Sequence, residues 1–577
     1  MTATAAKRPK PPDENDKLRA GTLSLDPDEG CQPVDPPAPP DGGGGGKRRK
    51  ESMAELLVRL AGEDGAEMFH DPDGGPFASV LIGGHRETWS LRTKAMRSWL
   101  SRLLYVREKR VPSSQALADA TALLEGKAVH DGAERPVAVR LGRHDGAIYL
   151  DLGDASWDVA RVTAAGWRVV PASESPVRFR RPRGLRPLPR PALGGSLDEL
   201  RELVNVPDEQ WPLVKGWLVV AVRGAGPFFV LCVQGEQGSA KSTLSKMLRR
   251  LVDPATVDLR SPPREERDLA VAATNALVLG VDNLSGVPDW LADALCRVAT
   301  GGGLATRELY TDSDEVLFDI TRPILLNGID DLLTRPDLAD RSLALNLPKI
   351  APDRRRQERD LWAAFGERHP RLLGALLAAA STALRLEGET VLGNPPRMAD
   401  AATWATAAEP ALGMAPGDFL RAMDSAREDA VAQGLEADPL AGAVRALAGE
   451  LRTWRGAASD LLPLLSAKAD DEVKRGKRWP KSPSALSSRL RRLAPSLWEV
   501  GVEVESGVKL GKGRREVRIR LLEGGEGGAP GVAGGGDAEE PVHGAPPLNF
   551  SGDNAGWRGG AGGDESPDRS DLDWSDE

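Results

Sequence analysis

A continuous apolar run, FFVLCV at 228–233, stands near the middle of the chain. A run of this length without polar positions is expected of a parallel strand that is covered on both faces. Apolar residues then recur at helical spacing over 244–251, which predicts a helix after a short polar segment. Two later runs, ALVLGVD at 276–282 and RPILLNG at 322–328, have the same apolar character. The pattern predicts an α/β domain with a parallel sheet over 195–386.

Helical patterns flank these strands. We expect a helix over 196–220 before the first strand, and a lid of two helices over 353–365 and 370–386 after the last one. Residues 387–438 are expected to form a helical linker.

Shorter elements precede the α/β domain and predict a small α+β domain over 52–180. They are helices at 54–60, 93–106 and 113–126, a hairpin at 77–82 and 87–91, and strands at 135–142, 147–153 and 166–170. A proline-rich basic connector at 178–191 closes this domain. Asp151 and Asp154 resemble a metal pair, as in a primase. No further acid or histidine stands at a suitable spacing, so we favour a structural or DNA-docking module.

Residues 440–522 read as three helices followed by a hairpin. In the third helix Leu486, Leu490, Leu493 and Leu497 fall on one face, Ser484, Ser488, Arg491 and Arg492 fall on the opposite face, and Arg489 lies at the flank. Such a helix can pack its leucines while Arg489, Arg491 and Arg492 contact the phosphates of DNA. With the basic hairpin as a wing, the segment resembles a winged helix. The alternative is a small α+β protein-docking domain.

Charge is distributed unevenly along the chain. The net charge is −9, but residues 523–577 contain thirteen acids and two arginines, so the rest of the chain carries +2. Residues 440–522 hold eighteen Lys and Arg against nine Asp and Glu. A basic module followed by an acidic tail is typical of a protein that binds nucleic acid. Two solvated surfaces of opposite sign are the alternative.

The composition excludes several classes of protein. The Pro-, Gly- and charge-rich segment 1–51 and the Gly- and acid-rich segment 523–577 are expected to be disordered. The cysteines Cys31, Cys232 and Cys296 form no C-x-x-C pair, so neither a disulfide scaffold nor a zinc site is expected. The sequence has no run of 18 apolar residues and no apolar signal-peptide core. We therefore expect a cytoplasmic protein with no membrane partner.

The polar segment after the first strand is close to the G-x-x-x-x-G-K-[ST] spacing of a phosphate-binding loop. It consists of Gly235, Glu236, Gln237, Gly238, Ser239, Ala240, Lys241, Ser242 and Thr243. We expect the two glycines to turn backbone amides toward phosphate, Lys241 to contact the outer phosphates, and Ser242 to contact Mg²⁺. Ala240 stands where a second glycine is usual. The loop predicts ATP and Mg²⁺ as ligands, and the alternative is a Gly/Ser-rich turn that binds nothing.

A carboxylate at the end of a neighbouring strand is needed to hold the magnesium shell. Asp282 ends the second apolar run and is the candidate; its alternative role is to cap an adjacent turn. Asn283 follows, where many such ATPases carry the glutamate that polarises the attacking water. This departure affects the expected rate of hydrolysis more than binding. Asp289 and Asp293 are possible substitutes for that glutamate.

The third apolar run ends in Asn327, which can orient water between the γ-phosphate and the second strand. Arg335 and Arg341 follow, and an arginine at a subunit edge can serve as a finger to the γ-phosphate of a neighbour. We favour Arg341, because it follows a short helical segment and precedes LALNLP, the expected last strand. The alternative for Arg341 is a surface ion pair with Asp337 or Asp340.

These motifs, GEQGSAKST, VLGVDNLSG at 278–286, 300–328 and RPDLADR at 335–341, together resemble the superfamily 3 helicases within the AAA+ ATPases. They are most similar to helicase–primase-type ATP-binding proteins of phages, plasmids and integrated elements. The resemblance implies a hairpin that contacts DNA in a central pore. Here 305–310 and 315–320 flank a turn, and Arg307 is the candidate contact; the hairpin can instead pack on the sheet.

The sequence therefore predicts an ATP-dependent DNA motor of a mobile element, acting in replication. It combines an α+β domain, a P-loop AAA+-like core and a winged-helix-like end, and forms a homo-oligomeric ring on single-stranded or forked DNA. The alternative is a DNA-binding ATP switch that is not a motor. Asn283, in place of the glutamate that polarises water, is the reason to keep this alternative.

Overall fold

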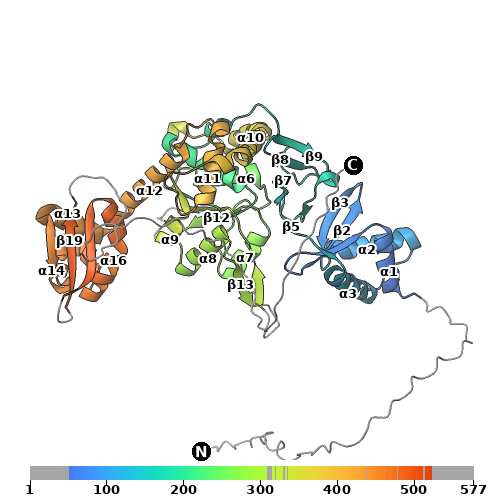
Figure 1. Cartoon of the computed structure of the whole chain (residues 1–577), viewed down its shortest axis with the longest axis horizontal. Helices are drawn as coiled ribbons and strands as arrows, with labels where there is room; N and C mark the ends of the chain where they lie inside the picture. Colours follow the sequence, from blue (N-terminus) through green and yellow to red (C-terminus); the bar gives the residue numbers. More distant parts are fainter. Residues whose placement is uncertain are drawn as a thin grey trace, which may run out of the picture. The chain divides into compact units, whose positions relative to one another are not determined.

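The computed structural model describes residues 51–307, 315–318, 320–328, 332–333, 335–436, 438–476, 479–510 and 514–522. The chain divides into two compact units between Gly434 and Leu435 (Figure 1). The fold is mixed α/β, with both parallel and antiparallel sheets. Within the described ranges, no helix is long and apolar enough to cross a membrane. Apart from Glu51, the terminal segments expected to be disordered lie outside these ranges.

A parallel four-stranded sheet forms the centre of the first unit. Its strands are β11 (Val230–Gly235), β12 (Leu279–Leu284), β15 (Ile324–Gly328) and β16 (Ser342–Leu347), in the order β12-β15-β11-β16. All three pairings are parallel. The carboxyl ends of all four strands therefore meet at one edge of the sheet, where α/β proteins usually bind ligands.

Both faces of this sheet are covered, as the continuous apolar run predicts. Leu231 and Val233 of β11 pack into one core together with α5 (Trp211–Ala221) and α6 (Lys241–Val252). The alternate side chains, Val230 and Cys232, pack on the other face against α7 and α8. These helices span Glu266–Thr274 and Asp289–Thr300.

The helices around the sheet differ from the prediction in two places. The single helix expected over 196–220 is interrupted, because Pro207 lacks an N–H donor, and only α5 and the short α4 (Asp198–Arg201) are α-helical. The expected pair of lid helices is one continuous helix, α10 (Glu358–Leu386), with Pro370 inside it. Phe365 and Leu372, on either side of this proline, are buried in the same core, so packing holds the two halves together.

The segment expected as a linker contributes to the core of the first unit. The helix α11 (Ala399–Ala408) packs against α5 and α10. Its Trp404 is fully buried and donates through Nε1 to the carbonyl oxygen of Val219 at 2.9 Å. The next helix, α12 (Asp418–Glu436), spans the division between the two units.

The N-terminal segment forms helices and sheets, as expected of an α+β domain, and most of its strand pairings are antiparallel. The helices are α1 (Met53–Glu63), α2 (Lys94–Glu108) and α3 (Ser114–His130). The predicted hairpin is β2 (Pro76–Ile82) with β3 (His85–Ser90), in a sheet of order β3-β2-β1-β4. The second sheet has the order β6-β7-β8-β9 and consists of Leu141–His144, Ala147–Asp151, Val159–Thr163 and Gly166–Val170. The strands β1 (Glu67–His70) and β8 were not predicted.

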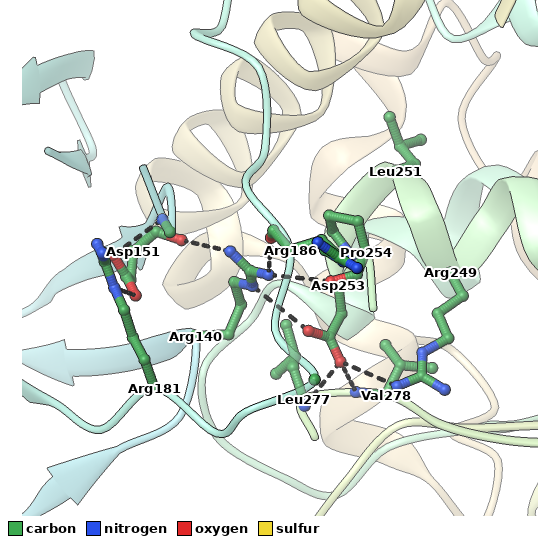
Figure 2. A network of polar contacts seen from close by, with 12 residues as sticks. Arg140, Asp151, Arg181, Arg186, Arg249, Leu251, Asp253, Pro254, Leu277 and Val278 are labelled. Atoms are coloured by element: carbon green, nitrogen blue, oxygen red, sulfur yellow. Dashed lines mark hydrogen bonds and ion pairs between the residues drawn. The ribbon is translucent and has the colours of Figure 1, made fainter. Parts of the chain in front are cut away.

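A network of buried charges joins this second sheet to the central domain (Figure 2). The guanidinium of Arg140 is fully buried, and its Nε lies 3.4 Å from Asp253 Oδ1 at the end of α6. It also donates to the carbonyl oxygens of Asp151, Arg186 and Pro254. Burial lowers the pKa of Arg140, and the charges of Asp253 and Asp151 oppose this. The charge of Arg140 is therefore matched by acceptors from three segments of the chain.

Asp253 and Asp151 complete this network. Asp253 Oδ2 accepts from the backbone N–H groups of Leu277 and Val278 at 2.9 and 3.1 Å, just before β12. Asp151 accepts two hydrogen bonds from Arg181. Asp151 is therefore engaged within this network, and the described part of the chain contains no group of three possible metal ligands.

The second unit consists of helices and one three-stranded sheet (orange to red in Figure 1). Its elements are α13 (Pro439–Leu451), β17 (Thr453–Gly456), α14 (Ala458–Ser466), α15 (Asp471–Arg475), α16 (Pro483–Glu499), β18 (Val502–Leu510) and β19 (Arg514–Leu521). The predicted hairpin is β18 with β19, and β17, which was not predicted, pairs with β19.

Candidate functional site

The loop between β11 and α6 has backbone conformations that are rare for ordinary residues. Gly235 and Gly238 have positive φ values of 144° and 89°. A Cβ atom at Gly235 would lie 2.5 Å from the carbonyl oxygen of Leu347, so a side chain does not fit there. Ala240, directly before the helix, is left-handed with φ 64° and ψ 29°. Glycine adopts this conformation without a steric penalty, whereas alanine does so at a cost of about 1–2 kcal/mol.

Lys241 begins α6, and its amine folds back on the loop. Nζ donates to the carbonyl oxygens of Gly235 and Glu236 at 2.6 and 2.9 Å. Partial burial lowers the pKa of Lys241, and the negative charge of Asp282 opposes this. Ala240 has no side chain that can cap the first turn of α6, so the loop combines a cation with uncapped backbone amides.

The other loop residues differ in exposure. Ser239 is buried, and its Oγ donates to the carbonyl oxygen of Glu236 at 2.9 Å, which closes the loop. The side chains of Glu236 and Gln237 are exposed, and Thr243 is half-buried. Glu236 also lies 3.8 Å from Lys349 Nζ.

Two strands, β12 and β15, bring polar side chains to the loop. Ser242 Oγ donates to Asp282 Oδ1 at 3.1 Å, so the hydroxyl and carboxylate predicted to share a magnesium shell are in contact. Asn327, at the end of β15, is 1% exposed, and its Nδ2 lies 3.4 Å from Ser245 Oγ. Its Oδ1 accepts from the backbone N–H of Asn283 at 2.9 Å. Since β15 lies between β11 and β12, Asn327 stands between the loop and Asp282.

Asn283 occupies a bulge at the end of β12. The register of β12 with β15 shifts between Val281 and Leu284, and Asn283 is left-handed with φ 58°. Asparagine tolerates this conformation better than most residues do. Bulges next to functional sites commonly redirect a side chain, and the side chain of Asn283 is exposed.

Two residues of the site were not found from the sequence. Ser245 lies one helical turn after Lys241, so its spacing of four residues is a signal that could have been used. Asn205 lies outside the loop sequence but is hydrogen-bonded to it. Its Nδ2 donates to the carbonyl oxygens of Pro348 and Ser239 at 2.5 and 3.4 Å. Asn205 is 34 residues before Ser239, and no local pattern marks it.

The two candidate finger residues have different surroundings. Arg335 is held by three carboxylates, those of Asp289, Asp293 and Asp337, at 3.5, 2.7 and 3.0 Å. Arg335 thereby also engages the two acids that were considered as substitutes for the missing glutamate. Arg341 donates instead to the backbone oxygen of Asp337 at 2.6 Å. Its position between α9 (Pro336–Ala339) and β16 agrees with the prediction.

Arg341 lies at the edge of the sheet opposite the loop. Its carbonyl oxygen accepts from the N–H of Val230, the first residue of β11, whereas the loop begins at the other end of this strand. Five residues of extended strand separate the two ends by about 16 Å. The structure therefore does not bring Arg341 to the loop of its own chain.

The other predicted contact residues lie outside this cluster. Arg307 ends β13 (Leu304–Arg307), which pairs antiparallel with β14 (Glu315–Phe318), opposite Glu315. The turn predicted between these strands, with residues 308–314, lies outside the described residues.

In the second unit, α16 buries Leu486, Leu490 and Leu497, as the pattern predicts, and Leu493 is half-buried. Arg491 and Arg492 are exposed. Arg489 is mostly buried and pairs with Asp438 at 2.7 Å, so it is engaged within the protein.

Comparison with known proteins identifies two segments. Residues 197–429 match the family model described as "Actinomycete integrative conjugative element replication protein". Residues 440–530 match the model "AICE RepA C-terminal domain". No curated protein matches the chain.

Solved structures with some likeness include "The apo structure of NrS-1 C terminal region (305-718)", at 12% identity and a TM-score of 0.36, covering 82% of this chain and 100% of that one. The "A form apo structure of NrS-1 C terminal region-CTR" has 11% identity and a TM-score of 0.37, with the same coverage. The two sequence matches identify residues 197–429 and 440–530 as parts of a replication protein of the actinomycete integrative conjugative element type.

Proposed function

We propose that this protein is a magnesium- and ATP-dependent motor that acts on DNA during replication of a mobile element. The observation that carries the proposal is the convergence of Lys241, Ser242, Asp282 and Asn327 at the carboxyl edge of one parallel sheet. A phosphate-binding loop, a metal-holding carboxylate and a polar group between them are among the parts that ATP hydrolysis requires.

In this proposal the loop of the P-loop core binds the phosphates. Lys241 exchanges the carbonyl oxygens of Gly235 and Glu236 for phosphate oxygens, and its positive charge then offsets the charge that develops during transfer. Ser242 and Asp282, which are in contact, would hold Mg²⁺, and the ion would offset the negative charge of the phosphates. Asn327 orients the attacking water.

Arg341 supports assembly into a ring. It cannot reach the loop of its own chain, because it lies at the opposite edge of the sheet. If Arg341 acts on a nucleotide, that nucleotide belongs to a neighbouring subunit, and a head-to-tail contact of this kind closes into a ring when the rotation permits.

The second unit supports the DNA-binding part of the proposal. Its three-stranded sheet β17-β19-β18, with α16 leading into the β18–β19 hairpin, resembles a winged helix. Arg491 and Arg492 are exposed on α16, opposite its buried leucines. We assign the phosphate contacts to these two residues, and Arg489 to holding α16 against Asp438.

Asn283 favours a second candidate function, a DNA-binding ATP switch. Asparagine provides no carboxylate to polarise water, and Asp289 and Asp293 are paired with Arg335. A switch would bind ATP and change its DNA affinity without repeated turnover.

ATPase turnover measured with and without single-stranded or forked DNA tests the proposal. The motor predicts turnover that DNA stimulates and that Asp282→Ala abolishes while nucleotide binding is partly retained. Asp268→Ala, which removes an exposed carboxylate on α7, is the matched control and should behave as wild type. Binding of ATP without turnover under any of these conditions would favour the switch, and failure to bind ATP would reject both.

A mixing experiment tests the ring. Arg341→Ala and Lys241→Ala should each be inactive alone. Their mixture should recover part of the activity, because some interfaces pair an intact loop with an intact arginine. A fully active monomer would reject the finger assignment.

A further inference from the structure

The exposed face of α2, in the N-terminal segment, is strongly basic. Residues 92–110 contain seven Lys and Arg and one acid, Glu108, a net charge of +6. The opposite face buries Met96, Trp99, Leu100, Leu103 and Leu104. The packing of α2 is therefore complete on one side, and its charges face solvent on the other.

Most of these charges are not neutralised within the protein. Among the described residues, ion pairs reach Arg92, from Glu125 at 3.3 Å, and Arg107, from Asp64 at 3.2 Å. The remaining five have none there: Lys94, Arg97, Arg102, Lys109 and Arg110. The neighbouring α3 differs, since it mixes Asp119 and Glu125 with Lys127 and His130.

The placement of the charges along α2 does not serve the stability of the helix. Lys94 is its first residue, Arg97 lies in the first turn, and this turn contains no acid. Cations at a helix N-terminus are electrostatically unfavourable, because the helix dipole is positive there. Like charges three to five residues apart also repel each other. Both costs are relieved when the face meets a polyanion.

An exposed aromatic ring lies within this basic face. Tyr105 is 56% exposed, and Lys109 Nζ lies 5.6 Å from the centre of its ring. Lys94, Ser98, Ser101 and Tyr105 recur at intervals of three and four residues, so they follow one line along the helix, about 16 Å long. The line combines one cation, two hydroxyl groups and one aromatic ring, and positive charge beside an aromatic ring is what proteins that bind single-stranded nucleic acid use.

We propose that this face of α2 binds the backbone of single-stranded DNA, with Tyr105 stacked on one base. It is a second DNA contact, separate from Arg491 and Arg492 of the second unit. The inference rests on the part of the proposed function that names DNA as the partner. It does not depend on ATP hydrolysis.

The test uses the full chain with the triple substitution R97Q/R102Q/K109Q. Binding to a fluorescent single-stranded oligonucleotide is measured at several salt concentrations. We expect weaker binding and a slope of log K against log salt that is smaller by about 2, since each phosphate contact to single-stranded DNA contributes about 0.7. The matched control R59Q/R168Q/R421Q removes three exposed arginines that are each paired with an acid, and should leave the slope nearly unchanged.

Tyr105→Ala separates stacking from charge. It should weaken single-strand binding about 5-fold or more, without changing the salt slope, and should affect duplex binding less. Thermal unfolding and DNA-free ATPase activity should stay at wild-type values in all these variants, because the substituted side chains are exposed and far in sequence from the nucleotide loop.

The outcomes distinguish this inference from the proposed function. If the intact protein binds DNA and the α2 triple substitution leaves affinity and slope unchanged, the inference is wrong and the motor proposal stands. If the triple substitution abolishes binding to vesicles containing phosphatidylserine but not to DNA, the face binds lipid and the inference is also wrong. If the intact protein binds no DNA, both proposals fall.

Discussion

The two ends of α6 are constructed in opposite ways. At the C-terminal end the carboxylate of Asp253 is buried and accepts from Arg140 and from two backbone N–H groups, while Arg249 lies 3.6 Å away. At the N-terminal end Lys241 and Ser242 remain partly exposed, and Ala240 leaves the first turn uncapped.

The difference separates structural from functional use of charge. A buried ion pair whose groups are all hydrogen-bonded resists change, because removal of one partner leaves the other charge uncompensated. A cation beside uncapped helical amides can instead accept a new anion. One helix thus anchors the β6–β9 sheet at one end and offers a phosphate site at the other.

The largest expected effect is at the C-terminal end of α6, where the charges are buried and paired. Arg140→Met should lower the free energy of unfolding of the first unit by about 3–5 kcal/mol, because Asp253 loses its buried charge partner and three carbonyl oxygens lose the hydrogen bonds that Arg140 donates. Urea denaturation measures this. Arg186→Met is the matched control, since only the backbone oxygen of this exposed residue takes part, and should change stability by less than about 0.5 kcal/mol. A loss below about 1 kcal/mol for Arg140→Met would contradict the buried-pair account.

At the N-terminal end of α6, a substitution should weaken ATP binding and leave the stability of the fold unchanged. Lys241→Ala should weaken ATP binding by about 1.5–3 kcal/mol, or about 10- to 150-fold, because a charge-assisted contact with phosphate is lost. Isothermal titration measures the affinity, and the unfolding midpoint should not move. Lys246→Ala, on the same helix, is the control. Equal affinities for Lys241→Ala and wild type would show that the loop is not the nucleotide site.

The pH dependence of stability tests the C-terminal end of α6 further. Burial against Phe365 lowers the pKa of His369 to about 4, and its Nε2 lies 3.3 Å from the carbonyl oxygen of Leu251 in α6. Since an unfolded histidine has a pKa of about 6.5, the unfolded state binds more protons between pH 6.5 and 4, and stability falls as the pH falls through this window.

Protonation of this histidine in the unfolded state should lower the free energy of unfolding of the wild-type protein by about 1.3 kcal/mol when the pH falls from 7.5 to 5.5. His369→Gln keeps a side-chain donor but does not titrate, so its stability should fall less over the same range. Urea midpoints at the two pH values measure the difference. Identical pH dependence in the two proteins would place the titration elsewhere.

The smallest effect is expected at the helix start. Ala240→Gly removes the cost of a left-handed alanine and should stabilise the protein by up to about 1 kcal/mol, with equal or tighter ATP binding. Ala95→Gly, at an exposed position of α2, should destabilise by about 1 kcal/mol, because there the backbone is helical. The same substitution should thus have opposite signs at the two sites, and thermal unfolding can show whether it does.

The sequence determined the local parts of this protein. The apolar run at 228–233, the helical spacing after it and the amphipathic pattern of α16 each predicted an element that the structure contains, because these patterns depend on neighbours a few residues apart. The order of loop, Asp282 and Asn327 along the chain likewise predicted which side chains are near each other.

Tertiary structure alone decided how these parts are joined. The insertion of β15 between β11 and β12, the pairing of the short β17, and the place of Arg341 at the far edge of the sheet follow from strand order, which no local pattern encodes. Arg140 and Asp253 are 113 residues apart, and each is an ordinary charged residue in the sequence. Only the folded chain removes both from water, and the cost of burying a charge then requires them to lie together.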